Sequence, residues 1–219
     1  MSHVISCRPQ VERKNHIAED NLPKIFSRFA ESIWGNENAV KIDLSGLDKF
    51  WQVRMFKKND FLFKEGEMIE EIDFIIQGAA KNFSLYHEKE VTASFLMEGS
   101  FCSTINNCQV HLTSPYSARC TENTTVLRMR MKNISALVQQ YPLFADTFLD
   151  HNNKIVEESK RRIWSFQVMN ARERYEDLMD RHPDILNRFN LSDIACYLGM
   201  QSETLSRVRN SYSKKIHSA

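Results

Sequence analysis

The sequence predicts an α+β protein with a β-rich N-terminal domain, a long connecting helix and a helical C-terminal domain. Short apolar or alternating runs between turn residues fill the stretch 53–131, which is typical of a sandwich or jelly roll. Helical periodicity then runs onward from 141, and a helix–Gly–helix pattern lies near the C-terminus. We therefore expect a polar arm over 1–20, a jelly-roll or double-stranded β-helix sensor domain over 21–140, a linking helix over 141–168 and a helix-turn-helix domain over 169–219.

Helices are expected before the first strand. An apolar stripe at helical spacing predicts a helix over 23–34, which Gly35 ends; its members are Ile25, Phe26, Phe29 and Ile33. We interpret 42–53 as a second short helix with Leu44, Leu47 and Trp51 on one side. Six apolar or alternating runs then predict strands, at 53–56, 61–63, 72–76, 80–86, 91–96 and 125–130.

The linking helix carries two apolar stripes. One recurs every seven residues and has polar residues at its intervening positions; this face consists of Leu149, Asn152, Val156, Ser159 and Ile163. The other contains Phe144, Phe148 and Ile155. Two stripes predict that one packs on the β domain while the heptad face pairs two subunits, with Asn152 and Ser159 fixing the register. The alternative is a single amphipathic helix on one core.

The stretch 191–209 has the plan of a helix-turn-helix. Its first helix has an inward face of Leu191, Ile194, Ala195 and Leu198, and Gly199 follows where a left-handed residue ends a helix at little energetic cost. The second helix begins at Gln201 or Ser202, with Leu205 and Val208 facing inward. A helical hairpin in an unrelated α domain is the alternative interpretation.

The second helix leaves polar side chains outward that suit DNA. An arginine can donate two hydrogen bonds to guanine, and a glutamate can accept from cytosine N4. Hydroxyl groups suit phosphates. The candidate DNA-binding residues are Ser192, Gln201, Ser202, Glu203, Thr204, Ser206, Arg207 and Asn210.

At these residues the chain resembles the Crp/Fnr superfamily of bacterial regulators. The family pattern is approximately IAxxLGxxxETxSR, and residues 194–207 read IACYLGMQSETLSR. Residues 171–179 resemble the first helix of the family's DNA domain, and residues 56–66 and 72–78 resemble the opening of its cyclic-nucleotide-binding-type β-roll. The resemblance places Glu203 and Arg207 on base-reading positions. It also implies a wing that is reduced or absent, because little chain follows the second helix.

The resemblance also locates a candidate effector pocket, which consists of Cys102, Ser103, Thr104, Tyr116 and Ser117. In ligand-binding relatives a Gly-Glu pair meets the ribose and an Arg-Ser/Thr pair meets the cyclic phosphate. Here Cys102 and Ser103 stand for the first pair, and Tyr116 stands in the arginine place. A buried phosphate without a cation is unfavourable, which argues against cyclic AMP. We expect no cofactor; another small effector stays open, as does no effector at all.

Composition narrows the function classes. The chain is 42% hydrophobic and 26% charged, with a net charge of +1, as in ordinary globular proteins. No apolar run approaches the roughly 20 residues of a membrane span, so we expect a cytoplasmic protein without a membrane partner. Its five cysteines lack disulfide or zinc spacing, and no enzyme motif is present.

We expect a homodimeric, sequence-specific transcription regulator that binds double-stranded DNA and can contact RNA polymerase. The alternative is a small-molecule-binding protein without a DNA role.

Overall fold

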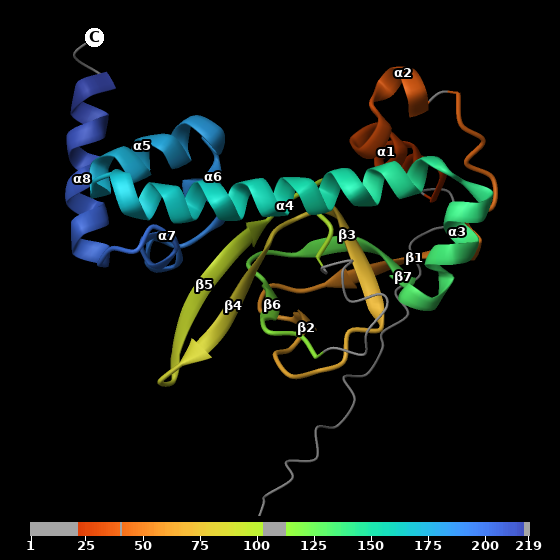
Figure 1. The fold of residues 1–219 in the computed structure, drawn as a ribbon, viewed down its shortest axis with the longest axis horizontal. Coiled ribbons are helices and arrows are strands. Elements are labelled where there is room, and N and C mark those ends of the chain that lie inside the picture. Colours follow the sequence, from red (N-terminus) through yellow and green to blue (C-terminus); the bar gives the residue numbers. More distant parts are fainter. Residues whose placement is uncertain (1–21, 40, 103–112, 217–219) are drawn as a thin grey trace, which may run out of the picture.

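A β-roll, a long helix and a cluster of short helices make up the protein. The computed structural model describes residues 22–39, 41–102 and 113–216. Figure 1 shows α4 (Leu143–Val168) running along the roll, with the C-terminal helices at one of its ends. The expected arm over 1–20 lies outside the described residues, as do Ser103 and Thr104 of the expected effector pocket.

Two antiparallel sheets form the roll. The three-stranded sheet has the order β1-β7-β3 and comprises β1 (Trp51–Phe56), β7 (Thr124–Arg130) and β3 (Glu71–Gln77). The four-stranded sheet has the order β2-β6-β4-β5 and comprises β2 (Phe61–Phe63), β6 (Ser117–Cys120), β4 (Ala80–Tyr86) and β5 (Lys89–Leu96). Consequently β5 is an edge strand of the second sheet, with β4 as its only strand partner among the described residues.

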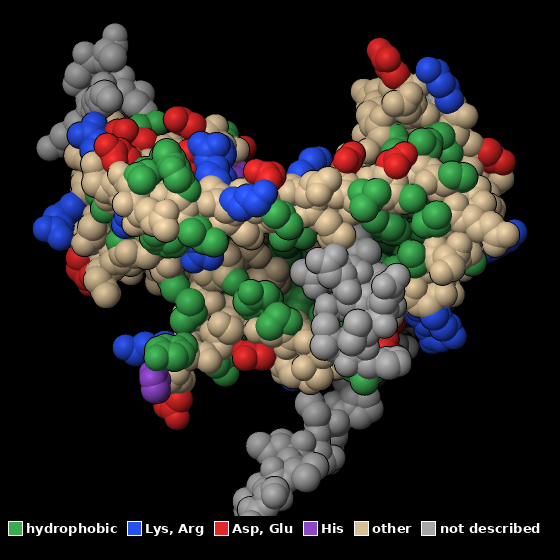
Figure 2. All heavy atoms as spheres, in the orientation of Figure 1, with side chains coloured by type: hydrophobic (Ala, Val, Ile, Leu, Met, Phe, Trp, Pro, Cys, Tyr) green, Lys and Arg blue, Asp and Glu red, His purple; other side chains and the backbone are tan. Residues whose placement is uncertain are grey.

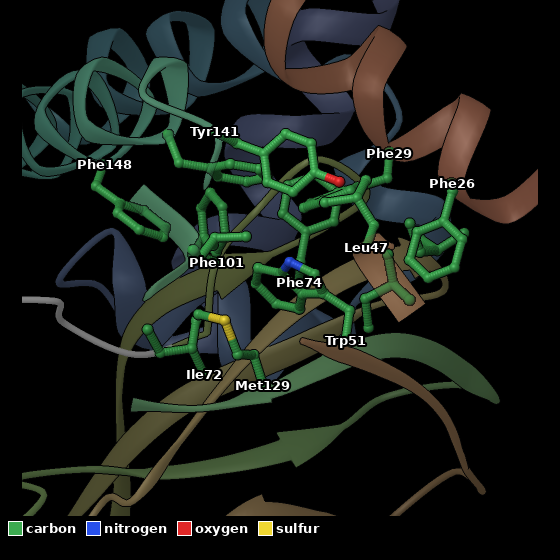
Figure 3. Close-up of a cluster of buried hydrophobic side chains, with 14 residues drawn as sticks. Phe26, Phe29, Leu47, Trp51, Ile72, Phe74, Phe101, Met129, Tyr141 and Phe148 are labelled. Atoms are coloured by element: carbon green, nitrogen blue, oxygen red, sulfur yellow. The ribbon is translucent and has the colours of Figure 1, made fainter. Parts of the chain in front are cut away.

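The roll has a hydrophobic cluster on each side of its first sheet. Between this sheet and the helices α1 (Leu22–Trp34), α3 (Ile134–Gln140) and α4, aromatic rings pack edge to face around the fully buried Phe29 (Figure 3). The Phe29 ring lies 4.7 Å from Phe74 and 5.1 Å from Trp51, between centroids. A second cluster draws side chains from both sheets, including Ile75, Val126 and Ala118. The stripe on α1 is therefore part of the core, as its periodicity predicts.

The prediction of a helix over 42–53 is wrong. Only Leu47–Lys49 form a 3-10 turn, and Trp51 starts β1, where it pairs with Met129. Gly46 has a φ of +91°, which an α-helix does not accommodate. Asp43 accepts hydrogen bonds from the backbone and the hydroxyl of Ser45, which favours a turn. Leu44, Leu47 and Trp51 therefore pack in one hydrophobic core but do not belong to a single helix.

The C-terminal region contains α5 (Ala171–Arg181), α6 (Ile185–Arg188), α7 (Leu191–Tyr197) and α8 (Ser202–Ile216). Asn170 begins α5 with a capping box, because its side chain accepts from the Glu173 backbone while the Glu173 carboxylate accepts from the Asn170 backbone. No strand occurs in the part of 169–216 that the structure describes, so no wing is present there. The other short helix, α2 (Asn36–Ala39), lies beside α1.

Candidate nucleic-acid interface

The turn between α7 and α8 is fixed by backbone hydrogen bonds around Gly199. The Met200 amide donates to the Ala195 carbonyl at 3.0 Å, and the Gly199 amide donates to Cys196 at 3.0 Å. Gly199 has a φ of +63°, and a Cβ there would lie 2.5 Å from Cε1 of Phe166 on α4. Only glycine fits both constraints. The turn is thus seated directly against the end of the long helix.

One face of α8 is buried and the other faces solvent. Leu205 is fully buried, and Tyr212 packs edge to face on Tyr175 of α5 at 5.5 Å. The exposed side chains are those the sequence predicts for DNA, namely Glu203, Ser206, Arg207 and Asn210, together with Arg209, which sequence analysis did not single out. Ser202 and Thr204 are half-buried, while Gln201 is exposed.

Arg207 is available for a ligand. Its guanidinium donates to the Thr204 hydroxyl at 3.4 Å, and no carboxylate of a described residue lies within salt-bridge distance of it. A guanidinium without a fixed acidic partner can form the bidentate contact that guanine presents in the major groove. The geometry therefore leaves the predicted base-reading group uncommitted.

Neighbouring elements hold this face rigidly. Arg174 of α5 donates to the carbonyl oxygens of Leu198 at 2.9 Å and Met169 at 2.7 Å, which ties α5 to the end of α7 and to the end of α4. The side chain of Asn190 caps α7 by accepting from the Asp193 amide at 2.8 Å. Ser192, a predicted DNA contact, is exposed at this end and bonds the Asn190 side chain at 2.7 Å.

The predicted effector residues lie in different environments. Cys102 is buried, and burial raises the pKa of its thiol well above the ordinary value, so it is an unreactive core residue. The Ser117 hydroxyl accepts from the Glu65 amide at 3.0 Å, whereas Tyr116 is 39% exposed. Arg119 is held by the Glu90 carboxylate at 2.6 and 2.7 Å. An effector at this place stays a prediction.

Sequence analysis missed a buried ion pair in the roll. Arg128 of β7 donates to both carboxylate oxygens of Asp73 on β3 at 2.7 Å, and Asp73 is 4% exposed. Burial lowers the pKa of this guanidinium, but the hydrogen bonds and charge of Asp73 raise it overall, so Arg128 stays charged and is held in place. The alternation of charged residues in two predicted strands was the available signal, but only the register places Asp73 opposite Arg128.

The heptad face of α4 is exposed in the single chain. Leu149 is 62% exposed, Val156 45% and Ile163 61%, whereas Phe144 and Phe148 of the other stripe are buried. Hydrophobic side chains are visible along this helix in Figure 2. The Ser159 hydroxyl bonds the Ile155 carbonyl at 2.8 Å, and Asn152 is half-buried. The end of the helix carries three more exposed apolar side chains, those of Trp164, Phe166 and Val168.

In the described ranges, no three His, Cys, Asp or Glu side chains gather in an arrangement that could hold a metal ion. None of the helices that the structure describes combines the length and apolar content that crossing a bilayer demands.

Comparison with known proteins gives consistent results. Residues 53–141 match the family model described as a cyclic nucleotide-binding domain. The transcriptional activator protein Anr of Pseudomonas protegens is 25% identical over 180 residues, which cover 76% of this chain and 72% of Anr. A CooA variant from Carboxydothermus hydrogenoformans has a TM-score of 0.67 at 20% identity, covering 81% of this chain and 84% of CooA. The c-di-GMP-responsive global regulator CLP of Xanthomonas campestris has a TM-score of 0.64 at 12% identity, covering 77% of this chain and 89% of CLP.

Proposed function

We propose that this chain, which belongs to the Crp/Fnr superfamily of transcription regulators, acts as a homodimer that binds a near-palindromic DNA operator. The observation that carries the proposal is the solvent-exposed face of α8 bearing Glu203, Ser206 and Arg207, opposite a buried face that fixes the helix. A rigid helix with polar, uncommitted side chains is what major-groove recognition requires.

Each side chain then has a defined role. Arg207 donates to O6 and N7 of a guanine, and Glu203 accepts from a cytosine N4. Ser192, Gln201, Ser202, Thr204, Ser206 and Asn210 position the helix on the sugar-phosphate backbone or add contacts to base edges. Arg209, exposed on the same helix, adds a phosphate contact.

Pairing of two chains through the α4 heptad face supplies the dimer. Leu149, Val156 and Ile163 would be covered by the same residues of a second copy, with Asn152 and Ser159 setting the register. Symmetry then presents two α8 helices to two half-sites. A contact with RNA polymerase belongs to the same proposal.

A signal received in the roll would act by changing the relative placement of the two α8 helices. Cyclic AMP does not fit the residues present, because Tyr116 stands where a phosphate-binding cation is needed and Arg119 is engaged by Glu90. The same argument counts against other effectors that bury a phosphate here, so a first effector screen uses small molecules without one. Domain boundaries at 140/141 and 168/169 are part of this proposal.

Selection of bound genomic DNA fragments by the purified full chain tests the proposal. We expect salt-sensitive, sequence-specific binding, and Arg207→Ala to weaken it by about 5- to 150-fold, which corresponds to roughly 1–3 kcal/mol for a bidentate base contact. Arg28→Ala is the matched control, because Arg28 is exposed on α1 and loses the same charge. Absence of binding to any fragment, with retained affinity for a metabolite, would instead support a small-molecule-binding protein.

A further inference from the structure

The helix-turn-helix covers an unpaired edge of the β-roll. Among the described strands, β5 pairs only with β4, so its other edge presents backbone groups that no strand satisfies there. Here the Thr92 amide donates to the Cys196 sulfur of α7 at 3.3 Å, and Arg162 of α4 donates to the Ala93 carbonyl at 2.9 Å. Phe95 packs on Phe189 and Tyr197, with ring centroids 4.3 and 5.0 Å apart.

A buried ion pair crosses this contact. The Lys81 ammonium of β4 lies 2.5 Å from an Asp193 carboxylate oxygen of α7, and their side chains are only 4% and 10% exposed. Lys81 also bonds Glu90 at 2.8 Å, and Arg119 bonds Glu90 in turn. Burial alone would raise the pKa of Glu90, but hydrogen bonds from Arg119 and Lys81 lower it overall. The chain of charges therefore runs from Arg119 in β6 through the roll to α7.

The Lys81–Asp193 ion pair contributes more to the orientation of α7 on β5 than to the free energy of folding. Desolvating two charges offsets much of their attraction. Removal of Lys81 leaves the buried Asp193 carboxylate without its cation, and removal of Asp193 leaves Lys81 with Glu90 as its remaining acidic partner. The second oxygen of Asp193 and the Thr92 hydroxyl are both buried without a hydrogen-bond partner among the described residues, which makes the contact less favourable still. Such an interface favours one orientation of α7 on β5.

We propose that Lys81 and Asp193 are positioning residues for DNA binding: their ion pair docks α7 on β5 and thereby fixes the orientation in which α8 meets the duplex. The docked arrangement leaves Glu203 and Arg207 exposed, as contact with DNA requires. The inference rests on the proposed function. Lys81 and Asp193 do not lie on the exposed face of α8, so they would affect DNA binding only through the placement of that helix.

A double-mutant cycle on the full chain tests this contact. The variants are Lys81→Met, Asp193→Leu and the double replacement, which removes both charges and leaves two apolar side chains. Lys160→Met is the matched control, because Lys160 and Glu157 form a pair of 2.8 Å on the exposed surface of α4. Hydrogen exchange of the free protein measures whether α7 is docked on β5. The affinity for a DNA fragment selected with the unaltered chain measures whether α8 is oriented for binding.

We expect each single replacement to raise amide exchange about tenfold or more in 89–96 and 191–198, with β1 and β7 unchanged. DNA affinity falls about tenfold in the single variants. The double variant recovers both quantities to within about threefold, and Lys160→Met changes neither. If the unaltered chain binds no DNA, the proposed function fails while hydrogen exchange still decides whether the pair docks α7.

The following results would overturn the proposal. The first is unchanged exchange in 89–96 and 191–198 after either single replacement. The second is an increase that spreads equally to β1 and β7, because the pair would then maintain the whole fold instead of one contact. The third is a pair of undocked single variants that bind DNA as tightly as the unaltered chain, or a double variant that is no better than the singles.

Discussion

At the scale of single residues, Gly199 is the position that the turn and the neighbouring helix constrain most. Alanine there would carry two penalties, the left-handed φ of +63° and the 2.5 Å approach to Phe166. We expect Gly199→Ala to lower the free energy of unfolding by about 2–4 kcal/mol, measured by urea denaturation. Gly66→Ala is the control, since Gly66 has a φ of +82° and nothing within 4 Å of a Cβ. It should lose only about 1–2 kcal/mol. Equal losses would show that Phe166 imposes no constraint.

His151 gives the roll a pH dependence at the same scale. Burial, reinforced by Lys154, lowers the pKa of this imidazole to about 4, below its ordinary value of 6.5. The unfolded chain therefore binds more protons between pH 6.5 and 4, so the contribution of His151 is complete above pH 6.5 and is lost as the pH falls toward 4. We expect His151→Gln to flatten the stability profile in this window by roughly 1–3 kcal/mol. His87→Gln is the matched control, because His87 is exposed at a turn.

At the scale of elements, local patterns predicted most of the roll and the long helix. Six strands and α1 follow from alternation or helical periodicity, because their inward faces are core. β6 was missed, because Ser117–Cys120 has no run of large apolar residues like that of β2, and this strand gains its partners from β2 and β4. The Lys81–Asp193 pair lies beyond any local signal, since 112 residues separate its members and only the docking of α7 brings them together.

The heptad face of α4 allows a direct test of the dimer. Val156 is 45% exposed in the single chain, so an aspartate there costs the monomer little but would place two carboxylates in the seam of a dimer. We expect Val156→Asp to raise the dimer dissociation constant by about 100-fold or more, measured by analytical ultracentrifugation. Val168→Asp is the matched control, because Val168 is 57% exposed on the same helix and off the heptad positions. A dimer that tolerates Val156→Asp would locate the interface elsewhere.

At the scale of the whole molecule, α4 links the parts that the proposed function needs. Its first half packs on the roll through Phe144 and Phe148, and its last turns contact the helix-turn-helix through Phe166. The heptad face stays exposed along the same helix, which runs from the roll to the C-terminal helices in Figure 1. A shift of α4 relative to a partner copy would therefore move both α8 helices at once, which is how one rigid element can convert a change in the roll into a change of half-site spacing.

This arrangement predicts a strict operator length. Two recognition helices of a symmetric dimer meet successive major grooves about 34 Å apart, on one side of the duplex. Inserting five base pairs between the half-sites turns one of them to the opposite side, so only one α8 can bind. We expect the affinity in a gel-shift assay to fall about 100-fold or more, to that of a single half-site. Replacing five central base pairs without changing the length is the control, and it should weaken binding far less. Equal affinity for both spacings would mean that each subunit reads its half-site independently.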